Sequence, residues 1–592
     1  MHQKNIIIMS VAALALAACT DNDNVIPVSQ TSWPKDSLSV FTAAEWLPGG
    51  EKGTTTNEQG CYSNQAPAIE SQGLYTTFKF GEQFFEKDAN LFTKPFWGLG
   101  PAWVRSGCEY CHPSYGHGKW QSQYRAKQMG NGYLLVVYHP TEGTTSDGRK
   151  YAANSYVTEL TGMPQTQAMS PFKAPIDEDG IHIKWQTVTS MPSGLAMTFP
   201  NSKRKESYRL YYPDVTIDPS AFHVTPKPEN YEVRLESTIG IYGTGLIDAI
   251  SQDSMKVQYQ REARHATLNP AMWDSGSNDW ASSAWYSLDD GTKRVKKFTY
   301  AMTRATLLDG PGANAIWNIT NVSRSDRHML YTDPQHAWAK AMRQDPEVIK
   351  GIQDIYKSNS LLTPYVSAGT SADSISKMVL KCLSLGANGG TAPYKSDFEK
   401  YFVNMAPWNG ADEMSDQDYY DFMVWHRGVG VPQARNLDSE EVQRGKLLFY
   451  KMGCTSCHRP SWTIKKDDCW TDAVTRRYMA STGAKMVTYD NTVIWPYTDL
   501  VQHRLFMAND IRTGWCRTTP LWGRGLSQQE TGAGDRLHDC RAHVFQSGDN
   551  AVVQAIMWHA YSQQSDAYWA AKQFYYLSDE DRDAVVAFIN AI

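Results

Sequence analysis

Two short cysteine–histidine motifs carry the clearest chemistry in this sequence. They are Cys108-x-x-Cys111-His112 and Cys454-x-x-Cys457-His458. Cysteines three positions apart on a helical turn lie on one face, so both thiols can reach the two vinyl groups of one porphyrin. The adjoining histidine then places its imidazole under the iron. Zinc and a thioredoxin-like dithiol are alternatives for Cys-x-x-Cys, but neither requires the trailing histidine. The sequence therefore predicts two covalently bound haem c groups, with His112 and His458 as proximal iron ligands.

The residue in the sixth iron position decides whether such a haem carries electrons or binds a substrate. For the second haem the candidate sulfur ligands are Met479, Met486 and Met507, and Met507 has the spacing typical of a small cytochrome c. His503, His538 and His559 follow the same motif. We take Met507 and His503 as candidate ligands, and His538 and His559 as candidate proton-transfer groups. For the first haem the sequence names no distal residue.

The N-terminus has the pattern of an export signal. Lys4 is followed by an apolar run from residue 6 to residue 18, too short to span a bilayer, and Leu16-Ala17-Ala18-Cys19 resembles a bacterial lipobox. That resemblance implies cleavage before Cys19, lipidation of Cys19 and, because Thr20 rather than Asp follows, an outer-membrane location. The alternative is an ordinary signal peptide with a chance cysteine. We expect an outer-membrane lipoprotein at the periplasmic face or cell surface, with the lipid as its only membrane anchor.

Composition excludes several function classes. The chain has 592 residues, a formal net charge of −5, 41% hydrophobic and 20% charged residues. These fractions are typical of a folded soluble body. The charge balance indicates neither nucleic-acid binding nor a polybasic membrane patch. The length is too great for one compact core, so we expect several domains.

Pattern changes along the chain predict a mainly α fold with an inserted β-containing region and two cytochrome c-like haem domains. Alternating segments at 181–188, 208–212 and 231–235 indicate strands. Near the C-terminus, Asp438 with Glu441 and Ser578 with Asp581 resemble helix starts. The expected division is a signal peptide (1–18), a tether (19–45), a first haem region (46–150), the β-containing insertion (151–325), a helical connection (326–435, with a loop at 386–393) and a second haem domain (436–592).

The remaining cysteines suggest limited cross-linking. Outside the two motifs and Cys19 they are Cys61, Cys382, Cys469, Cys516 and Cys540. An exported compartment permits disulfides. We expect one bridge among Cys469, Cys516 and Cys540, which lie closest in sequence, and leave the other pairings open.

Several stretches, in order, resemble the bacterial di-haem oxidoreductase family, whose members are described as peroxidases or thiol oxidoreductase-like proteins. They run from about residue 78 to the C-terminus. The matching stretches are Gly98–Pro101 leading into the first motif, Gly243–Ile250, Gly445–Phe449 into the second motif, Tyr497–Leu500 with His503, Arg517–Gly523, Leu537–Ala542 and Trp558-His559.

The resemblance implies two cytochrome c-like domains and a distant relation to dihaem cytochrome c peroxidases, in which one haem stores an electron and the other cleaves hydrogen peroxide. Three departures stand out. Leu537 replaces the methionine that ligates iron in those peroxidases, Cys540 replaces a glycine after His538-Asp539, and Met507 lies two places later than the family's methionine after His503.

The leading hypothesis is therefore an exported dihaem, peroxidase-like oxidoreductase, served by a redox partner protein or a small-molecule electron donor and using peroxide as substrate. The second hypothesis is a non-enzymatic surface electron carrier, linked through the family to iron acquisition. The third is an oxygenase that uses one of its haems to react with dioxygen. Donor, substrate, sixth ligands and oligomeric state stay open at this point.

Overall fold

The computed structural model describes residues 38–89, 99, 102–160, 162–310, 319–320, 322, 324–326, 337–355, 369–383 and 413–592. Cys19, the side chain of Cys382 and the expected loop at 386–393 lie outside these residues. The α-helices are α2 (Gly50–Gly53), α3 (Pro67–Ser71), α4 (Tyr75–Glu86), α5 (Thr244–Asp248), α6 (Gln252–Glu262), α7 (Ala337–Gln344), α8 (Pro346–Ile355), α9 (Ala372–Leu383), α11 (Asp416–Gly428), α12 (Glu440–Lys451), α13 (Ala473–Thr482), α14 (Ser527–Thr531), α15 (Ala551–His559), α16 (Tyr568–Tyr575) and α17 (Asp579–Ala591).

The strands pair two by two. Only β1 (Thr54–Thr55) with β14 (Val431–Pro432) is a parallel pair among the described strands. The antiparallel pairs are β2 (Ala102–Trp103) with β6 (Gln167–Ala168), β3 (Tyr133–Tyr138) with β9 (Glu232–Ser237), β4 (Gly143–Thr144) with β5 (Lys150–Tyr151), β7 (Ile181–Thr187) with β8 (Tyr211–Ile217), β10 (Trp273–Asp274) with β11 (Asp279–Trp280), β12 (Trp285–Ser287) with β13 (Lys293–Val295), β15 (Trp462–Ile464) with β16 (Thr492–Ile494), and β17 (Gln502–His503) with β18 (Cys516–Arg517).

The fold is mixed rather than mainly α, with 34% helix and 15% strand. Residues 151–325 contain strands as expected, but β3 lies before that region and β15 to β18 lie in the C-terminal part. Most of these extra pairs are two or three residues long, and segments that short leave no alternating pattern in the sequence. Two of the short pairs, β2 with β6 and β15 with β16, include a strand that lies next to one of the two motifs in the chain.

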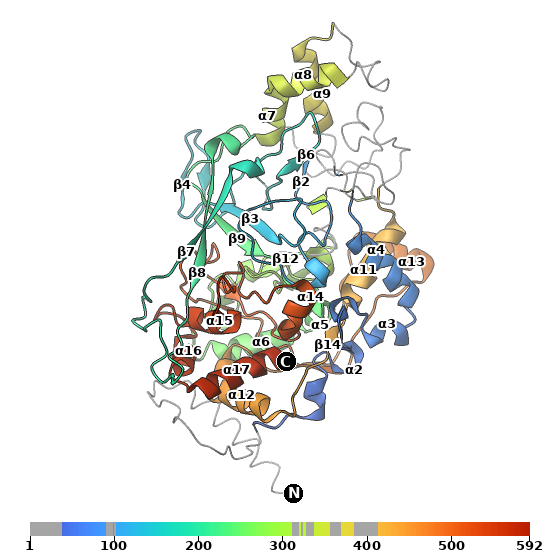
Figure 1. The fold of residues 1–592 in the computed structure, drawn as a ribbon. Helices are drawn as coiled ribbons and strands as arrows, with labels where there is room; N and C mark the ends of the chain where they lie inside the picture. Colours follow the sequence, from blue (N-terminus) through green and yellow to red (C-terminus); the bar gives the residue numbers. More distant parts are fainter. Residues whose placement is uncertain are drawn as a thin grey trace.

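In Figure 1 the C-terminal helices α12 and α15 to α17 gather at the lower left, next to the long hairpin β7–β8. The N-terminal helices α2 to α4 lie on the opposite side with α11 and α13, and α7 to α9 project at the top. Helix α4 packs along α11 so closely that a Cβ on Gly81 would collide with the backbone carbonyl of Asp421. Segments more than three hundred residues apart therefore form one packed unit.

The C-terminal helix pair confirms two sequence predictions. Ser578 caps α17 by accepting a hydrogen bond from the Asp581 amide, and Val585, Phe588 and Ile589 of this helix are buried. Helix α12 begins at Glu440, two residues after the expected start. It crosses α17 at Gly445, where an added Cβ would collide with the carbonyl of Ala584. Only glycine permits this approach.

The described cysteines form no disulfides. Cys469, Cys516 and Cys540 are free thiols, so the expected bridge among them is wrong. Each sulfur instead points at a backbone carbonyl: Cys469 at Trp470, Cys516 at Arg517 and Cys540 at Gly118. The three residues lie on separate segments, with Cys516 in β18 and Cys469 and Cys540 in loops, and none of the three thiols is paired.

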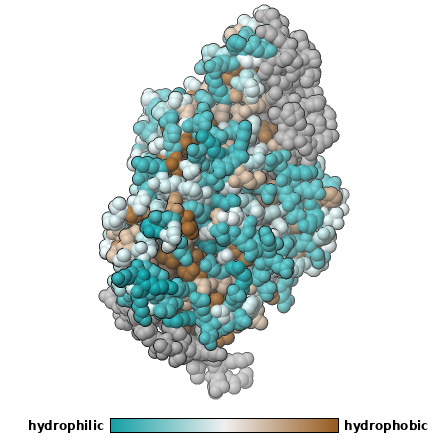
Figure 2. Space-filling view, in the orientation of Figure 1, coloured by the Kyte–Doolittle hydropathy of each residue, from teal (hydrophilic) through white to brown (hydrophobic). Residues whose placement is uncertain are grey.

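The surface on the face shown in Figure 2 is largely hydrophilic, with apolar side chains gathered over the region of α15 and α16. No helix in the described part of the chain is long and apolar enough to cross a bilayer.

A buried ion network joins α11 to two other parts of the fold. Arg427 is fully buried and pairs with Asp248 of α5 and with Asp467. We expect Arg427→Met to lower the free energy of unfolding by about 3–5 kcal/mol, because it leaves two buried carboxylates unpaired. Urea unfolding measures the change. Arg476→Met, which removes a half-exposed pair with Asp289, should cost at most about 1 kcal/mol. Equal losses in the two variants would contradict the assignment.

Candidate functional site

The second motif is built on the turn that ends α12. Gly453 adopts a left-handed conformation (φ 80°) and starts a short 3-10 turn over Cys454–Ser456. The backbone amide of His458 donates to the carbonyl of Cys454 at 2.9 Å. This turn brings both thiols and the imidazole to one side, as the spacing predicts.

In both motif histidines, Nδ1 is hydrogen-bonded to a backbone carbonyl, which leaves Nε2 available to bind iron. The Nδ1–H of His458 donates to the Tyr497 carbonyl (3.1 Å), and that of His112 donates to the Ile239 carbonyl (2.7 Å). Metal-binding histidines are oriented in this way, with Nε2 left free as ligand. Burial, and then the neighbouring His559, lower the pKa of His458 to about 4, and burial lowers the pKa of His112 to about 4. Both imidazoles are therefore neutral and able to ligate iron at neutral pH.

A cavity of about 190 Å³ opens beside the second motif. Its lining contains Cys454, Cys457 and His458, and much of the remaining wall is apolar. The apolar lining includes Phe449, Val552, Ile556, Val585 and Ile589, from α12, α15 and α17. A porphyrin with two vinyl groups fits this cavity chemically, because the lining combines apolar side chains with the thiols of Cys454 and Cys457 and the Nε2 of His458.

His559, at the end of α15, lies across from His458 in this cavity. The two ring centroids are 6.5 Å apart, and His559 Nδ1–H donates to the Ala555 carbonyl at 2.7 Å. Metal–imidazole bonds are about 2 Å long and a ring nitrogen lies roughly 1 Å from its centroid, so two imidazoles on opposite sides of one metal have centroids about 6 Å apart. The separation and the free Nε2 of His559 both fit a pair of axial ligands.

The other predicted ligands of the second haem lie nearby. Met507 lines the cavity and packs within the apolar cluster that contains α12 and α17. His503 also lines it, but its Nε2 is hydrogen-bonded to Asp499 (2.8 Å) and lies 3.5 Å from Glu262. Because carboxylates engage that nitrogen, His503 is less suited than His559 to bind iron. Met479 and Met486 belong to a different core cluster.

His538 lines the same cavity and is buried. Its Nε2 lies 3.8 Å from the carboxylates of Asp510 and Asp539, and its Nδ1 has no hydrogen-bond partner within the described chain. Burial lowers the pKa of His538 below its ordinary value. A neutral imidazole with one unpartnered nitrogen beside two carboxylates is able to accept and pass on a proton.

The turn around His538 explains one departure from the family pattern. Cys540 has a φ of 60° and Leu537 a φ of 69°, both in the left-handed region. A glycine adopts that conformation without strain, whereas a side chain costs on the order of 1 kcal/mol. The turn therefore keeps the shape that glycine favours, although Cys540 occupies it.

The first motif lies among aromatic side chains. The Phe85 ring is 6.4 Å from His112 and 4.7 Å from Trp425, the neighbour of His426. Among the described residues, no imidazole faces His112 as His559 faces His458. His426 is buried, its Nδ1 has no described hydrogen-bond partner, and burial followed by His112 lowers the pKa of His426 to about 3.

Sequence reasoning missed His426 and His117. His117 follows the first motif by five residues and lines the cavity of the second motif. Burial, then Arg524 and Arg536, keep the pKa of His117 well below its ordinary value. The proximity of His117 to His112 in the chain was the only signal available, and nothing local distinguishes His426.

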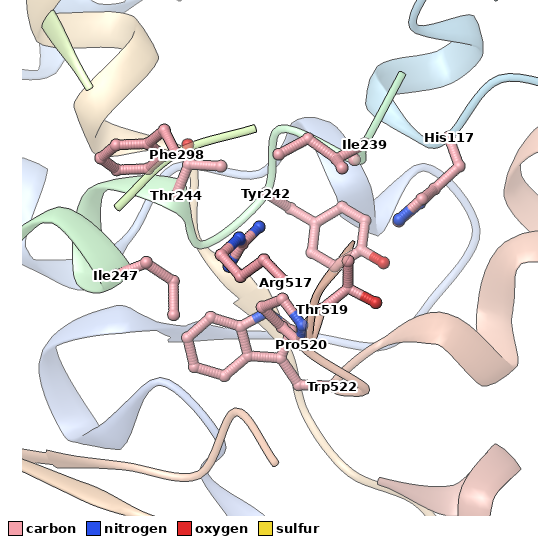
Figure 3. Close-up of a pocket in the computed structure, with 11 residues that line it drawn as sticks. His117, Ile239, Tyr242, Thr244, Ile247, Phe298, Arg517, Thr519, Pro520 and Trp522 are labelled. Carbon is pink, nitrogen blue, oxygen red and sulfur yellow. The ribbon is translucent and has the colours of Figure 1, made fainter. Parts of the chain in front are cut away.

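A second, smaller cavity of about 30 Å³ shares His117, Arg517, Thr519 and Pro520 with the larger one. Figure 3 shows Tyr242 near the centre of its lining, with Arg517 on one side and His117 on the other. This volume holds about two water molecules. The two cavities therefore adjoin each other at these four shared residues.

Comparison with known proteins identifies one family. Residues 386–592 match the family described as "Di-haem oxidoreductase, putative peroxidase". No curated protein and no solved structure matches the chain. The matched residues include the second motif, the cavity beside it, His538 and His559.

Proposed function

We propose that this chain, which belongs through residues 386–592 to the di-haem oxidoreductase family, is an exported c-type dihaem enzyme that reduces peroxide. The proposal places one haem c at Cys108, Cys111 and His112 and another at Cys454, Cys457 and His458, each in a cytochrome c-like domain. When bound, the haems supply one-electron storage and an iron that reacts with peroxide.

The observation that carries the proposal is the difference between the two sites. At the second site His458 and His559 face each other, so we assign His559 as an axial ligand rather than the proton-transfer group that the sequence suggested. At the first site His112 faces no second imidazole within the described residues. An iron held on one side only is open to a substrate. We therefore place peroxide at the first site and electron transfer at the second.

The chain's own residues supply the proton handling. Reduction of hydrogen peroxide to two waters breaks the O–O bond and consumes two protons and two electrons, the latter from an external donor. His426 can accept a proton at its unpartnered Nδ1, because burial keeps this imidazole neutral. His538, beside Asp510, can serve the second cavity in the same way.

Electron paramagnetic resonance and visible spectra of the purified protein test this assignment. We expect two haems per chain, one low-spin with two imidazole ligands and one with an open position in the oxidised or half-reduced protein. Peroxide should change only the signal of the open haem. Two six-coordinate low-spin haems that ignore peroxide in every redox state would overturn the enzymatic proposal.

The closed second site favours one competing function, a surface electron carrier without peroxide chemistry. Rapid reduction of ferric complexes with no peroxide turnover would establish it. In either case we propose that lipidated Cys19 anchors the protein to the outer membrane. Metabolic labelling with palmitate tests the anchor, and protease treatment of whole cells distinguishes the surface from the periplasmic face.

A further inference from the structure

Three arginines line the cavity beside the second motif. They are Arg517, Arg524 and Arg536. Arg517 is 2% exposed and Arg524 is 6% exposed, whereas Arg536 is half-buried. Figure 3 shows that Arg517 also reaches the smaller cavity next to Tyr242.

None of these three guanidinium groups has an ion-pair partner in the described part of the chain. Arg524 donates to the Ser527 hydroxyl and to the Asp535 backbone carbonyl. Arg536 donates to the backbone carbonyls of Gly534 and Arg524. Arg517 donates through Nε to the Thr299 carbonyl, and its Nη1 has no hydrogen-bond partner among the described residues.

Several buried arginines elsewhere in the molecule have carboxylate partners, whereas Arg105 is held by backbone carbonyls and the Tyr124 hydroxyl. Arg427 pairs with Asp248 and Asp467, Arg541 with Asp539, and Arg582 with Asp579. Burying an unpaired charge is costly, and clustering like charges adds to the cost. Burial and then the neighbouring Arg524 lower the pKa of Arg536 to about 9. The three arginines therefore give the cavity wall an excess of positive charge, because Asp566 is the one carboxylate among its described lining residues.

A ligand that fits this lining combines an apolar body with anionic groups. The lining also contains the apolar residues Phe449, Val585 and Ile589, and Cys454 and Cys457 lie in the same cavity. A haem meets all three requirements, because its ring is apolar, its vinyl groups meet the cysteines and its two propionates are carboxylates. Guanidinium groups bind carboxylates through directed, charge-assisted hydrogen bonds.

We infer that Arg517, Arg524 and Arg536 bind the propionate carboxylates of the haem attached at Cys454 and Cys457. The inference rests on the proposed function, because it requires a haem at the second motif. Positive charge next to the haem favours the reduced state, which carries one more electron. The three arginines therefore raise the reduction potential of the second haem.

The test is potentiometric titration of the full-length, haem-loaded protein, with single Arg517→Gln, Arg524→Gln and Arg536→Gln variants. We expect at least one variant to shift the ferric–ferrous equilibrium of the low-spin second haem about tenfold toward the ferric state, which is 59 mV for a one-electron couple. The matching Lys variants should recover part of the shift. Arg476→Gln, at the half-exposed pair with Asp289, is the control and should leave the potential unchanged.

A second measurement needs no variant. If the propionates occupy the arginines, titration of the wild-type protein with inorganic phosphate should leave the second haem's potential unchanged. A saturable shift with phosphate would mean that the arginines form a free anion site and would overturn the inference, as would unchanged potentials in all three Gln variants. Failure of the proposed function gives a different result. Haems that ignore peroxide would overturn the enzymatic proposal while the potential of the second haem can still be titrated, and absence of any second-haem signal would show that the second motif binds no haem.

Discussion

Replacing His559 with alanine should convert the second haem from a six-coordinate low-spin centre to a high-spin one. His559 lies with its ring centroid 6.5 Å from that of His458, and its Nδ1 is committed to the Ala555 carbonyl. Alanine removes the imidazole that faces His458, so we expect nearly complete loss of the bis-imidazole signal. Electron paramagnetic resonance and visible spectra measure the change, and added imidazole should restore the low-spin form.

A substitution of the same type outside the cavity controls for general effects. His543 stacks on Trp120 and bonds to Asp535, and it is not among the cavity residues. His543→Ala should therefore keep both haem spectra. His559→Met should restore six-coordination with a higher potential, because a Met/His ligand pair raises the potential of a haem. If His559→Ala leaves the spectrum unchanged and Met507→Ala alters it, Met507 is the ligand and our assignment is wrong.

Removing the thiols of one motif should remove one haem. We expect the double variant Cys454→Ala/Cys457→Ala to carry one covalent haem per chain instead of two. The double variant Cys108→Ala/Cys111→Ala should lose the haem of the first motif and keep that of the second. Pyridine haemochrome spectra and the intact mass of the chain measure the stoichiometry. The first double variant should also be less stable, because an unfilled cavity of about 190 Å³ costs up to about 5 kcal/mol at the rate measured for apolar cavities.

Cys469→Ala is the control for this experiment. Cys469 is a free thiol outside both motifs, so its loss should leave two haems in place. Retention of both covalent haems in either double variant would show that the thiols do not form the attachment. Loss of both haems from one double variant would show instead that the two sites do not load independently.

The turn of each motif and the cap of α17 could be predicted from the sequence because both depend on residues that are neighbours in the chain. The two motifs place thiols and imidazole on one turn through backbone hydrogen bonds between Cys454 and His458, and the same holds for Cys108 and His112. The cap of α17 at Ser578 follows from the same short-range rules. The family, too, was recognisable from ordered local stretches and is confirmed over residues 386–592.

Short strands and the state of the cysteines could not be predicted from the local sequence. Pairs such as β1 with β14 are two residues long and form because packing brings distant segments together. The expected bridge among Cys469, Cys516 and Cys540 is wrong for the same reason, since the three thiols lie on separate segments whose positions depend on packing.

The sequence by itself predicted which residues hold haem, namely the two motifs with His112 and His458. Only the tertiary structure showed which side chains face His458 and which charged groups line the cavity beside it. His559 faces His458 because α15 crosses the cavity, and Arg517, Arg524 and Arg536 meet there from separate loops. His426 approaches the first site because α11 packs on α4 through Gly81. Covalent attachment depends on spacing along the chain, whereas ligand pairing and charge balance depend on packing between segments that the chain order does not join.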